Sequence, residues 1–318
     1  MRSSLPEPDT PDFIAATAAL GLDFCQAGVM HELDPALDRS RLRELRQEAQ
    51  VQGVRIGTGL GMLNPAREER LGPLVAAGDG DLTDGVIRVV DVASAGGFDR
   101  LFFMIGTLED RFSGDPEWSA QLDGCASLIE RLAPVLRAKG VRLLLKTHEE
   151  ITSREIVRLV ERVGEDVLGV AFDPVNLLVR GEDPLAAARR LAPLVEQVHL
   201  DDAVMVFEGR GLRRYLSNMG QGVIDWTGIL DVMPDVLRVI DLHGGQFAVD
   251  LFDPEFVVSD PDLTVGDLAT VTAMAARQEA NATIPDQART LARLAAALAH
   301  PAMANKDLTN NREQGVSI

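Results

Sequence analysis

The chain has 318 residues, of which 46% are hydrophobic and only 4% aromatic, and 31 basic against 49 acidic residues give a net charge of −18. This excess of negative charge repels nucleic-acid phosphates and anionic membranes, and no run of about 18 apolar residues is present to span a bilayer. The first ten residues lack the apolar segment of a secretion signal, and two cysteines are too few for a disulfide scaffold. We therefore expect a cytoplasmic α/β protein without a nucleic-acid or membrane partner.

Short β-rich segments alternate with amphipathic helical segments along the chain. In chain order, the predicted strands are Asp23–Met30, Val54–Leu60, Arg100–Thr107, Val141–His148, Val167–Asp173, Val195–Asp201 and Leu237–His243. The predicted helices include Leu42–Gln52, Ser119–Lys139, Ser153–Val163, Pro184–Ala192, Thr264–Glu279 and Ile284–Leu298. Strands separated by helices form parallel units with right-handed crossovers. This order predicts either an open doubly wound sheet or a (β/α)8 TIM barrel that is one strand short.

The N-terminus is where a barrel would lack its strand. Asp12–Leu20 is predicted to be a helix leading into the first visible strand, and nothing before Asp12 resembles a strand. The first strand is therefore expected to be missing or degenerate. Residues 1–300 are expected to form a single domain with extra C-terminal helices, the last of which is rich in alanine and suits packing or a homo-oligomer. The polar tail, residues 301–318, is expected to be disordered.

Ionisable side chains stand at the ends of four successive predicted strands, which read LLLKTHEE, GVAFDPVN, QVHLDD and VIDLHGG. In a parallel α/β barrel these carboxyl ends face the active site. Because side chains alternate along a strand, the pairs Lys146/His148, His199/Asp201 and Asp241/His243 can each share one face. Asp and His together suit a divalent cation such as Mn, Mg, Co or Zn. A site at the strand ends is therefore predicted.

The segments THEEITSREIVRLVERVGEDVLGVAFDPVN, LAPLVEQVHLDDA, GQGVIDWTGIL and FDPEF, in this order, resemble the xylose-isomerase-like TIM-barrel superfamily. The resemblance is strongest over residues 119–256. It implies a TIM barrel, since the superfamily includes sugar isomerases and epimerases, inosose and dehydroshikimate dehydratases and endonuclease IV. The endonuclease branch is excluded, because five histidines are too few for its zinc cluster and the charge is wrong for DNA.

The resemblance also implies one divalent metal held by a Glu, an Asp, a His and a second Glu from four strand ends. Asp173 matches the family Asp and His199 the family His, and Asp241 stands where the second Glu is expected. Lys146 stands where the first Glu should be, and Asp201 stands where the family commonly has a Lys. The implied metal ligands are thus Asp173, His199 and Asp241.

The exchange at Lys146 has two interpretations. In one, Asp201 or Glu149 becomes a metal ligand and Lys146 contacts the substrate. In the other, the Lys146 ammonium lies where the metal would be and pairs with Asp173 and Asp241.

The leading functional hypothesis is an isomerase or epimerase that acts on a small keto-sugar, polyol or sugar phosphate by metal-assisted proton transfer beside a carbonyl. Lys146, Asp241 and His148 are the candidate catalytic residues, and a buried lysine with a depressed pKa could act as a base. The candidate substrate-binding residues are Asp201, Asn176 and Arg210. One alternative is a lyase or dehydratase that uses Lys146 without a metal, including as a Schiff base. The other is a non-catalytic subunit or binding protein.

Several nearby residues have simpler interpretations. Glu149 and Glu150 are predicted to lie in a solvated loop or helix start, with Thr152 or Ser153 capping the next helix. The segment GRGLRRY is predicted to be a solvated loop, although its arginines could bind a phosphate or carboxylate. For Asn176, the sequence favours a structural role over a catalytic one.

Overall fold

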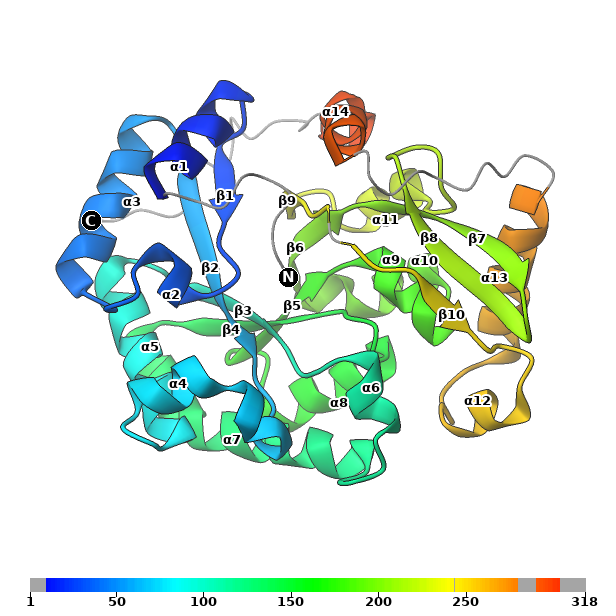
Figure 1. The fold of residues 1–318 in the computed structure, drawn as a ribbon, viewed down its shortest axis with the longest axis horizontal. Helices are drawn as coiled ribbons and strands as arrows, with labels where there is room; N and C mark the ends of the chain where they lie inside the picture. Colours follow the sequence, from blue (N-terminus) through cyan, green and yellow to red (C-terminus); the bar gives the residue numbers. More distant parts are fainter. Residues whose placement is uncertain (1–9, 243, 280–289, 304–318) are drawn as a thin grey trace.

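The computed structural model describes residues 10–242, 244–279 and 290–303. Its main sheet has seven parallel strands in the order β1-β2-β3-β4-β5-β6-β9. The strands are β1 Phe24–Gln26, β2 Arg55–Met62, β3 Arg100–Met104, β4 Arg142–Lys146, β5 Leu168–Phe172, β6 Val195–Leu200 and β9 Leu237–Ile240. They curve into a nearly closed barrel surrounded by helices (Figure 1). All seven predicted strands and the TIM-barrel fold class are confirmed, and the place predicted for the missing strand, before residue 10, lies outside the described residues.

Helices follow the barrel strands and cover the outside of the sheet (Figure 1). The α-helices are α1 Thr10–Ala19, α2 Met30–Leu33, α3 Arg39–Val51, α4 Gly72–Ala77, α5 Leu82–Gly96, α6 Leu108–Phe112, α7 Trp118–Lys139, α8 Ser153–Val163, α9 Pro174–Leu177, α10 Pro184–Leu191, α11 Trp226–Val232, α12 Pro254–Val258, α13 Val265–Glu279 and α14 Thr290–Ala299. Short 3-10 helices span Pro65–Arg70, Leu178–Arg180, Ala192–Leu194 and Pro301–Met303. The extra C-terminal helices α13 and α14 match the prediction, although residues 284–289 of the last predicted helix, and residues 304–318 of the tail, lie outside the described residues.

Helix α8 shows how the sequence forms these elements. The Thr152 side chain accepts a hydrogen bond from the Glu155 backbone, and the Glu155 carboxylate accepts one from the Thr152 backbone, which is a capping box. Ile156, Leu159 and Val160 are buried on one face. The predicted cap at Thr152 is confirmed.

A β-hairpin follows β6, where the sequence predicted a solvated loop. Strands β7 Asp202–Glu208 and β8 Gly211–Ser217 are antiparallel, and β10 Phe247–Val249 adds a third strand along β8. Gly209, at φ +59°, takes the left-handed backbone conformation that this tight turn requires. Helix α13 packs against β7 (Figure 1). The loop prediction for GRGLRRY was therefore wrong from Gly211 onward, because β8 pairs with β7 on one edge and with β10 on the other, and most of its residues are buried.

The hydrophobic core is continuous from α1 to the C-terminal helices. Among the described residues, none of the helices combines the length and apolar character needed to cross a membrane. The two cysteines, Cys25 and Cys125, are both buried free thiols.

Candidate active site

The carboxyl ends of four strands bring together a buried group of ionisable side chains. Lys146 is the last residue of β4, His199 lies near the end of β6, and Asp173 and Asp241 directly follow β5 and β9. We call this group the Lys146 centre: Lys146, Asp173, His199 and Asp241. Parallel strands place their carboxyl ends at one face of the barrel, which is why residues almost 100 positions apart converge there.

Lys146 pairs with both carboxylates of the centre. Its Nζ lies 3.0 Å from Asp173 Oδ2 and 2.6 Å from Asp241 Oδ2. Lys146 and Asp173 are buried, whereas the Asp241 side chain is 26% exposed. Burial alone lowers the pKa of Lys146, but the charges of Asp241 and Asp173 outweigh it and hold that pKa above its usual value. Lys146 is therefore a protonated ammonium group, and the depressed lysine pKa considered from the sequence is wrong.

His199 is fixed by hydrogen bonds at both ring nitrogens. Its Nδ1 lies 2.8 Å from Asp241 Oδ2 and donates to it, since an ionised carboxylate can only accept. Its Nε2 lies 2.7 Å from Gln197 Nε2, so this nitrogen accepts from the amide. The Phe102 ring packs edge-on against the imidazole. Gln197 was not predicted, although its position two residues before His199 on one strand places both side chains on the same face.

Asp173 is held by Thr147, directly after β4, and by Asn176 of α9. The Asn176 amide donates to Asp173 Oδ2 at 2.9 Å and to the Thr147 carbonyl at 3.2 Å. The Thr147 hydroxyl donates to the Asp173 carbonyl at 2.9 Å. Asn176 thus holds Asp173 in place, which agrees with the structural role expected for it.

A second buried group lies beside the centre, and we call it the His148 group: His148, Glu149 and Glu150. Nε2 of His148 is 2.8 Å from Glu149 Oε2, and Nδ1 is 2.5 Å from Glu150 Oε2. Glu150 also accepts from the Gly106 backbone at 2.9 Å. Burial lowers the pKa of His148, but Glu150 and Glu149 outweigh it and raise that pKa to about 10. The prediction that Glu149 and Glu150 are solvated was wrong, because a histidine cation and a backbone amide satisfy their charges inside the protein.

Asp201 and Arg210, predicted to bind substrate, are engaged elsewhere. Asp201 is buried, and Arg293 Nη2 of α14 donates to its two oxygens at 2.8 and 2.7 Å. Burial raises the pKa of Asp201 well above its usual value, although Arg293 opposes this. Arg210 lies in the β7–β8 turn, 70% exposed, and pairs with Asp250 and Asp253. The structure therefore does not bring Arg210 into the Lys146 centre.

Arg214 of β8 is a buried cation that sequence reasoning did not place. Its Nη1 donates to Asn176 Oδ1 at 3.3 Å, its Nη2 donates to the Gly245 carbonyl at 3.1 Å, and its guanidinium lies 4.9 Å from the Phe247 ring centroid. Arg214 thereby connects the hairpin sheet to the residue that holds Asp173. Neither Arg214 nor Arg293 could be assigned from a single motif, because their partners belong to distant segments.

The donor atoms suit a metal, but the position of Lys146 does not. One ligand atom from each of Asp173, His199 and Asp241 lies within 4.8 Å of the others, which is a ligand set for a divalent ion. However, Lys146 Nζ is bonded to both carboxylates in the space between them. A dication about 3 Å from an ammonium group is repelled by on the order of 10 kcal/mol at an effective dielectric constant of about 20. With Lys146 in this position, the centre does not fit a metal ion.

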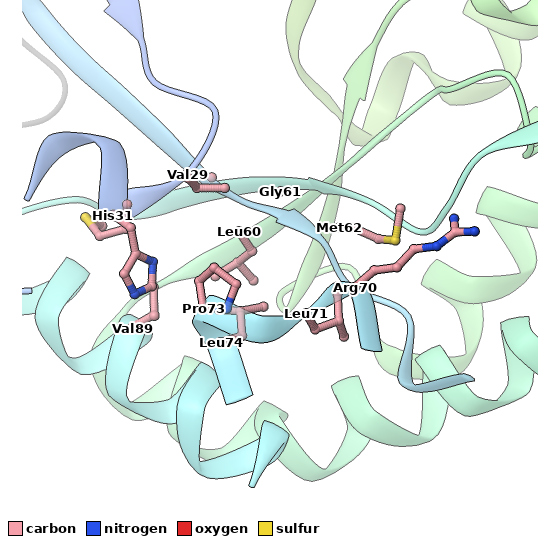
Figure 2. Close-up of a pocket in the computed structure, with 12 residues that line it drawn as sticks. Val29, His31, Leu60, Gly61, Met62, Arg70, Leu71, Pro73, Leu74 and Val89 are labelled. Atoms are coloured by element: carbon pink, nitrogen blue, oxygen red, sulfur yellow. The ribbon is translucent and has the colours of Figure 1, made fainter. Parts of the chain in front are cut away.

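Two cavities lie outside the Lys146 centre. Figure 2 shows one of about 120 Å³ that is lined mainly by apolar side chains of β2 and α4, with His31 and Arg70 at its edge. A larger cavity of about 490 Å³ lies between α6, β10 and α12, and Arg210, one of its lining residues, pairs with Asp250 and Asp253. Neither cavity is lined by a residue of the centre.

The arrangement of the barrel strands agrees with the protein-family comparison. The model of the xylose isomerase-like TIM barrel family matches residues 14–236. The chain belongs to this family. The resemblance stated from the sequence is thereby confirmed.

Sequence relatives include one uncharacterized protein, YihM, and two proteins with names that describe lyase reactions. YihM of Escherichia coli K12 is 30% identical over 126 residues, covering 39% of each chain. An inosose dehydratase of Geobacillus kaustophilus is 27% identical over 129 residues, which is 36% of this chain and 41% of that one. A 3-oxo-isoapionate decarboxylase of Pectobacterium atrosepticum is 23% identical over 217 residues, or 68% of this chain and 66% of that one. The matches thus span about two fifths to two thirds of the length of these relatives.

Solved structures of similar fold include a D-psicose 3-epimerase determined in the presence of D-fructose, at 17% identity and a TM-score of 0.56, covering 86% of this chain and 92% of that one. The IOLI protein with a bound zinc atom is 15% identical, with a TM-score of 0.55, covering 87% and 94%. At these identities the likeness concerns the fold alone. The names of the dehydratase, the decarboxylase and the epimerase indicate that those proteins are enzymes with small carbohydrate-like substrates.

Proposed function

We propose that this chain is a lyase that acts on a small polyhydroxylated ketone, such as an inosose or a keto-sugar, and removes water next to the carbonyl group. The observation that carries the proposal is the pairing of Lys146 with Asp241 at the strand ends, with Nζ 2.6 Å from Oδ2. This pair places a cation and a carboxylate side by side. It stands where the family resemblance led us to expect two carboxylates.

Each member of the pair has a role in such an elimination. Asp241 is the partly exposed carboxylate of the centre, so it is the group that can reach a substrate and remove the proton on the carbon beside the carbonyl. The Lys146 ammonium lies next to it and stabilises the negative charge that develops on the carbonyl oxygen. The Asp241 carboxyl then returns its proton to the hydroxyl that leaves from the adjacent carbon, so that water departs and a carbon–carbon double bond forms. One carboxylate, Asp241, is therefore enough for both proton transfers of this elimination.

An epimerase makes a different demand on the site. It needs one group to remove a proton from one face of the carbon and another to supply a proton on the opposite face, with the roles exchanged in the reverse reaction. Lys146 would have to be a neutral amine for half of this cycle, yet its protons are held by two carboxylates. The same bonds leave no lone pair for a Schiff base. Isomerase or epimerase activity, the leading hypothesis from the sequence, is thus the second candidate.

The test is a reaction in D₂O followed by proton NMR, with inososes, ketohexoses and 3-oxo sugar acids as substrates. Lyase activity appears as a dehydrated product, and we expect it to fall by roughly two orders of magnitude or more in Asp241→Asn and in Lys146→Met. Lys139→Met is the matched control, since Lys139 is a half-exposed residue at the end of α7. It should retain full activity.

Three other results would contradict the proposal. Deuterium incorporation with inversion and no loss of water would identify an epimerase. Loss of CO₂ from a 3-oxo acid alone would identify a decarboxylase. No turnover in the whole panel, together with a stable complex with another protein on copurification, would favour the non-catalytic alternative. Cytoplasmic location and self-association stay predictions, the latter to be measured by light scattering.

A further inference from the structure

We infer that the Lys146 ammonium takes the place of a divalent metal ion, so that the wild-type centre binds no metal and a single change, Lys146→Glu, creates a metal site. The inference concerns the same residues as the proposed lyase site. Its test measures metal binding without substrate, however, so the inference and the proposed lyase activity can each fail independently of the other.

The spacing of the centre is the first support. Oxygen and nitrogen ligands of a first-row metal ion lie about 2.0–2.2 Å from the metal and therefore about 3 Å from each other. Asp241 Oδ2 is 2.8 Å from His199 Nδ1, and the ligand atoms of Asp173, His199 and Asp241 all lie within 4.8 Å. The ligand cage is thus almost assembled. The group that contacts both Asp173 and Asp241 inside this cage is the Lys146 ammonium.

The second support is that, among the described residues, the two carboxylates suggested from the sequence as a further ligand, Asp201 and Glu149, are engaged with other groups. Asp201 receives two hydrogen bonds from Arg293, and both groups are buried. Glu149 is bound to His148 at 2.8 Å inside its own buried group. Moving either carboxylate would break a buried ion pair, which is destabilising in proteins generally. The geometry therefore favours the second of the two interpretations that the sequence left open.

Glutamate at position 146 would complete the cage. It would place a third carboxylate at the end of β4, so that β4, β5, β6 and β9 each supply one ligand at the same face of the barrel. It would also remove the positive charge that repels a cation. Lys146→Gln also removes the positive charge, but its neutral amide oxygen is a weaker metal ligand than the carboxylate of glutamate.

The experiment measures Mn²⁺ binding by calorimetry and by metal content after dialysis, in wild type, Lys146→Glu, Lys146→Gln and Lys146→Glu/His199→Ala. We expect Lys146→Glu to bind one Mn²⁺ more than wild type, and the double variant to bind it about 10- to 100-fold more weakly. Mn²⁺ should raise the melting temperature of both single variants and leave that of wild type unchanged. Taking the difference from wild type cancels any Mn²⁺ held by the His148 group.

Two results would overturn the inference. One is an equivalent of Mn²⁺ bound by wild type and lost in His199→Ala, because this would mean that Lys146 moves aside for a metal. The other is a folded Lys146→Glu that binds no more Mn²⁺ than wild type. If neither position-146 variant folds, wild type and His199→Ala decide the question: equal Mn²⁺ binding by the two supports the inference.

Discussion

Replacing Lys146 by methionine removes the cation between two carboxylates and keeps most of the aliphatic side chain. Asp173 is completely buried and Asp241 is 26% exposed, so the change leaves two neighbouring anions, one of which has no access to water. Breaking a buried ion pair by removing one partner costs about 3–5 kcal/mol. Because Asp241 can recover some hydration and Asn176 still donates to Asp173, we expect the lower end, about 3 kcal/mol.

The assay is urea denaturation, which gives the free energy of unfolding of wild type and variants. Lys139→Met provides the matched control, because Lys139 pairs with Asp91 at the surface and such pairs contribute about 0–1 kcal/mol. Asp241→Asn added to Lys146→Met should recover part of the loss, since it removes one of the two neighbouring negative charges. A loss in Lys146→Met no larger than that in Lys139→Met would refute the assignment of Lys146 as the buried partner of both carboxylates.

Three further predictions concern other parts of the chain. The pKa of His148 is raised to about 10, so its protonation contributes stability that is fully present below the unfolded-state pKa of about 6.5 and is lost as the pH rises through 10. NMR titration of labelled histidines should show the His148 ring protonated at pH 8, and a titration midpoint near 6.5 would contradict this. Arg293→Met leaves Asp201 as an unpaired buried carboxylate, so the free energy of unfolding should fall by about 3 kcal/mol or more and α14 should become sensitive to proteases, whereas wild-type protease resistance would count against the pair. Gly222→Ala would place a Cβ 2.0 Å from an oxygen of Asp202 and should cost about 1–3 kcal/mol in thermal or urea unfolding; the control Gly124→Ala lies in α7 with open space around it and should be neutral or stabilising.

The barrel could be predicted from the sequence because its signals are local. Each strand is a short apolar run bounded by helical segments, and the order of these runs fixes a parallel sheet. The convergence of Lys146, Asp173, His199 and Asp241 followed from the same reasoning, since parallel strands bring their carboxyl ends together. The choice between the two interpretations of Lys146 required distances, which the sequence does not contain.

The partners from distant segments could not be predicted. Arg293 meets Asp201 across 92 positions, and nothing in either local sequence indicates the other. The burial of Glu149 and Glu150 depends on His148 and on a backbone amide at Gly106, so two adjacent glutamates that would ordinarily face water lie inside the protein. The hairpin was missed because neither strand has the alternating pattern of a surface strand, and β8 carries two adjacent arginines, Arg213 and Arg214, which are typical of a solvated loop.

The most direct test of the central claim is a crystal structure of the wild-type protein grown with excess MnCl₂ and measured for anomalous scattering. We predict density for the Lys146 side chain reaching between Asp173 and Asp241, with no manganese peak within bonding distance of His199. A manganese peak bound by Asp173, His199 and Asp241, with Lys146 turned away, would contradict the account.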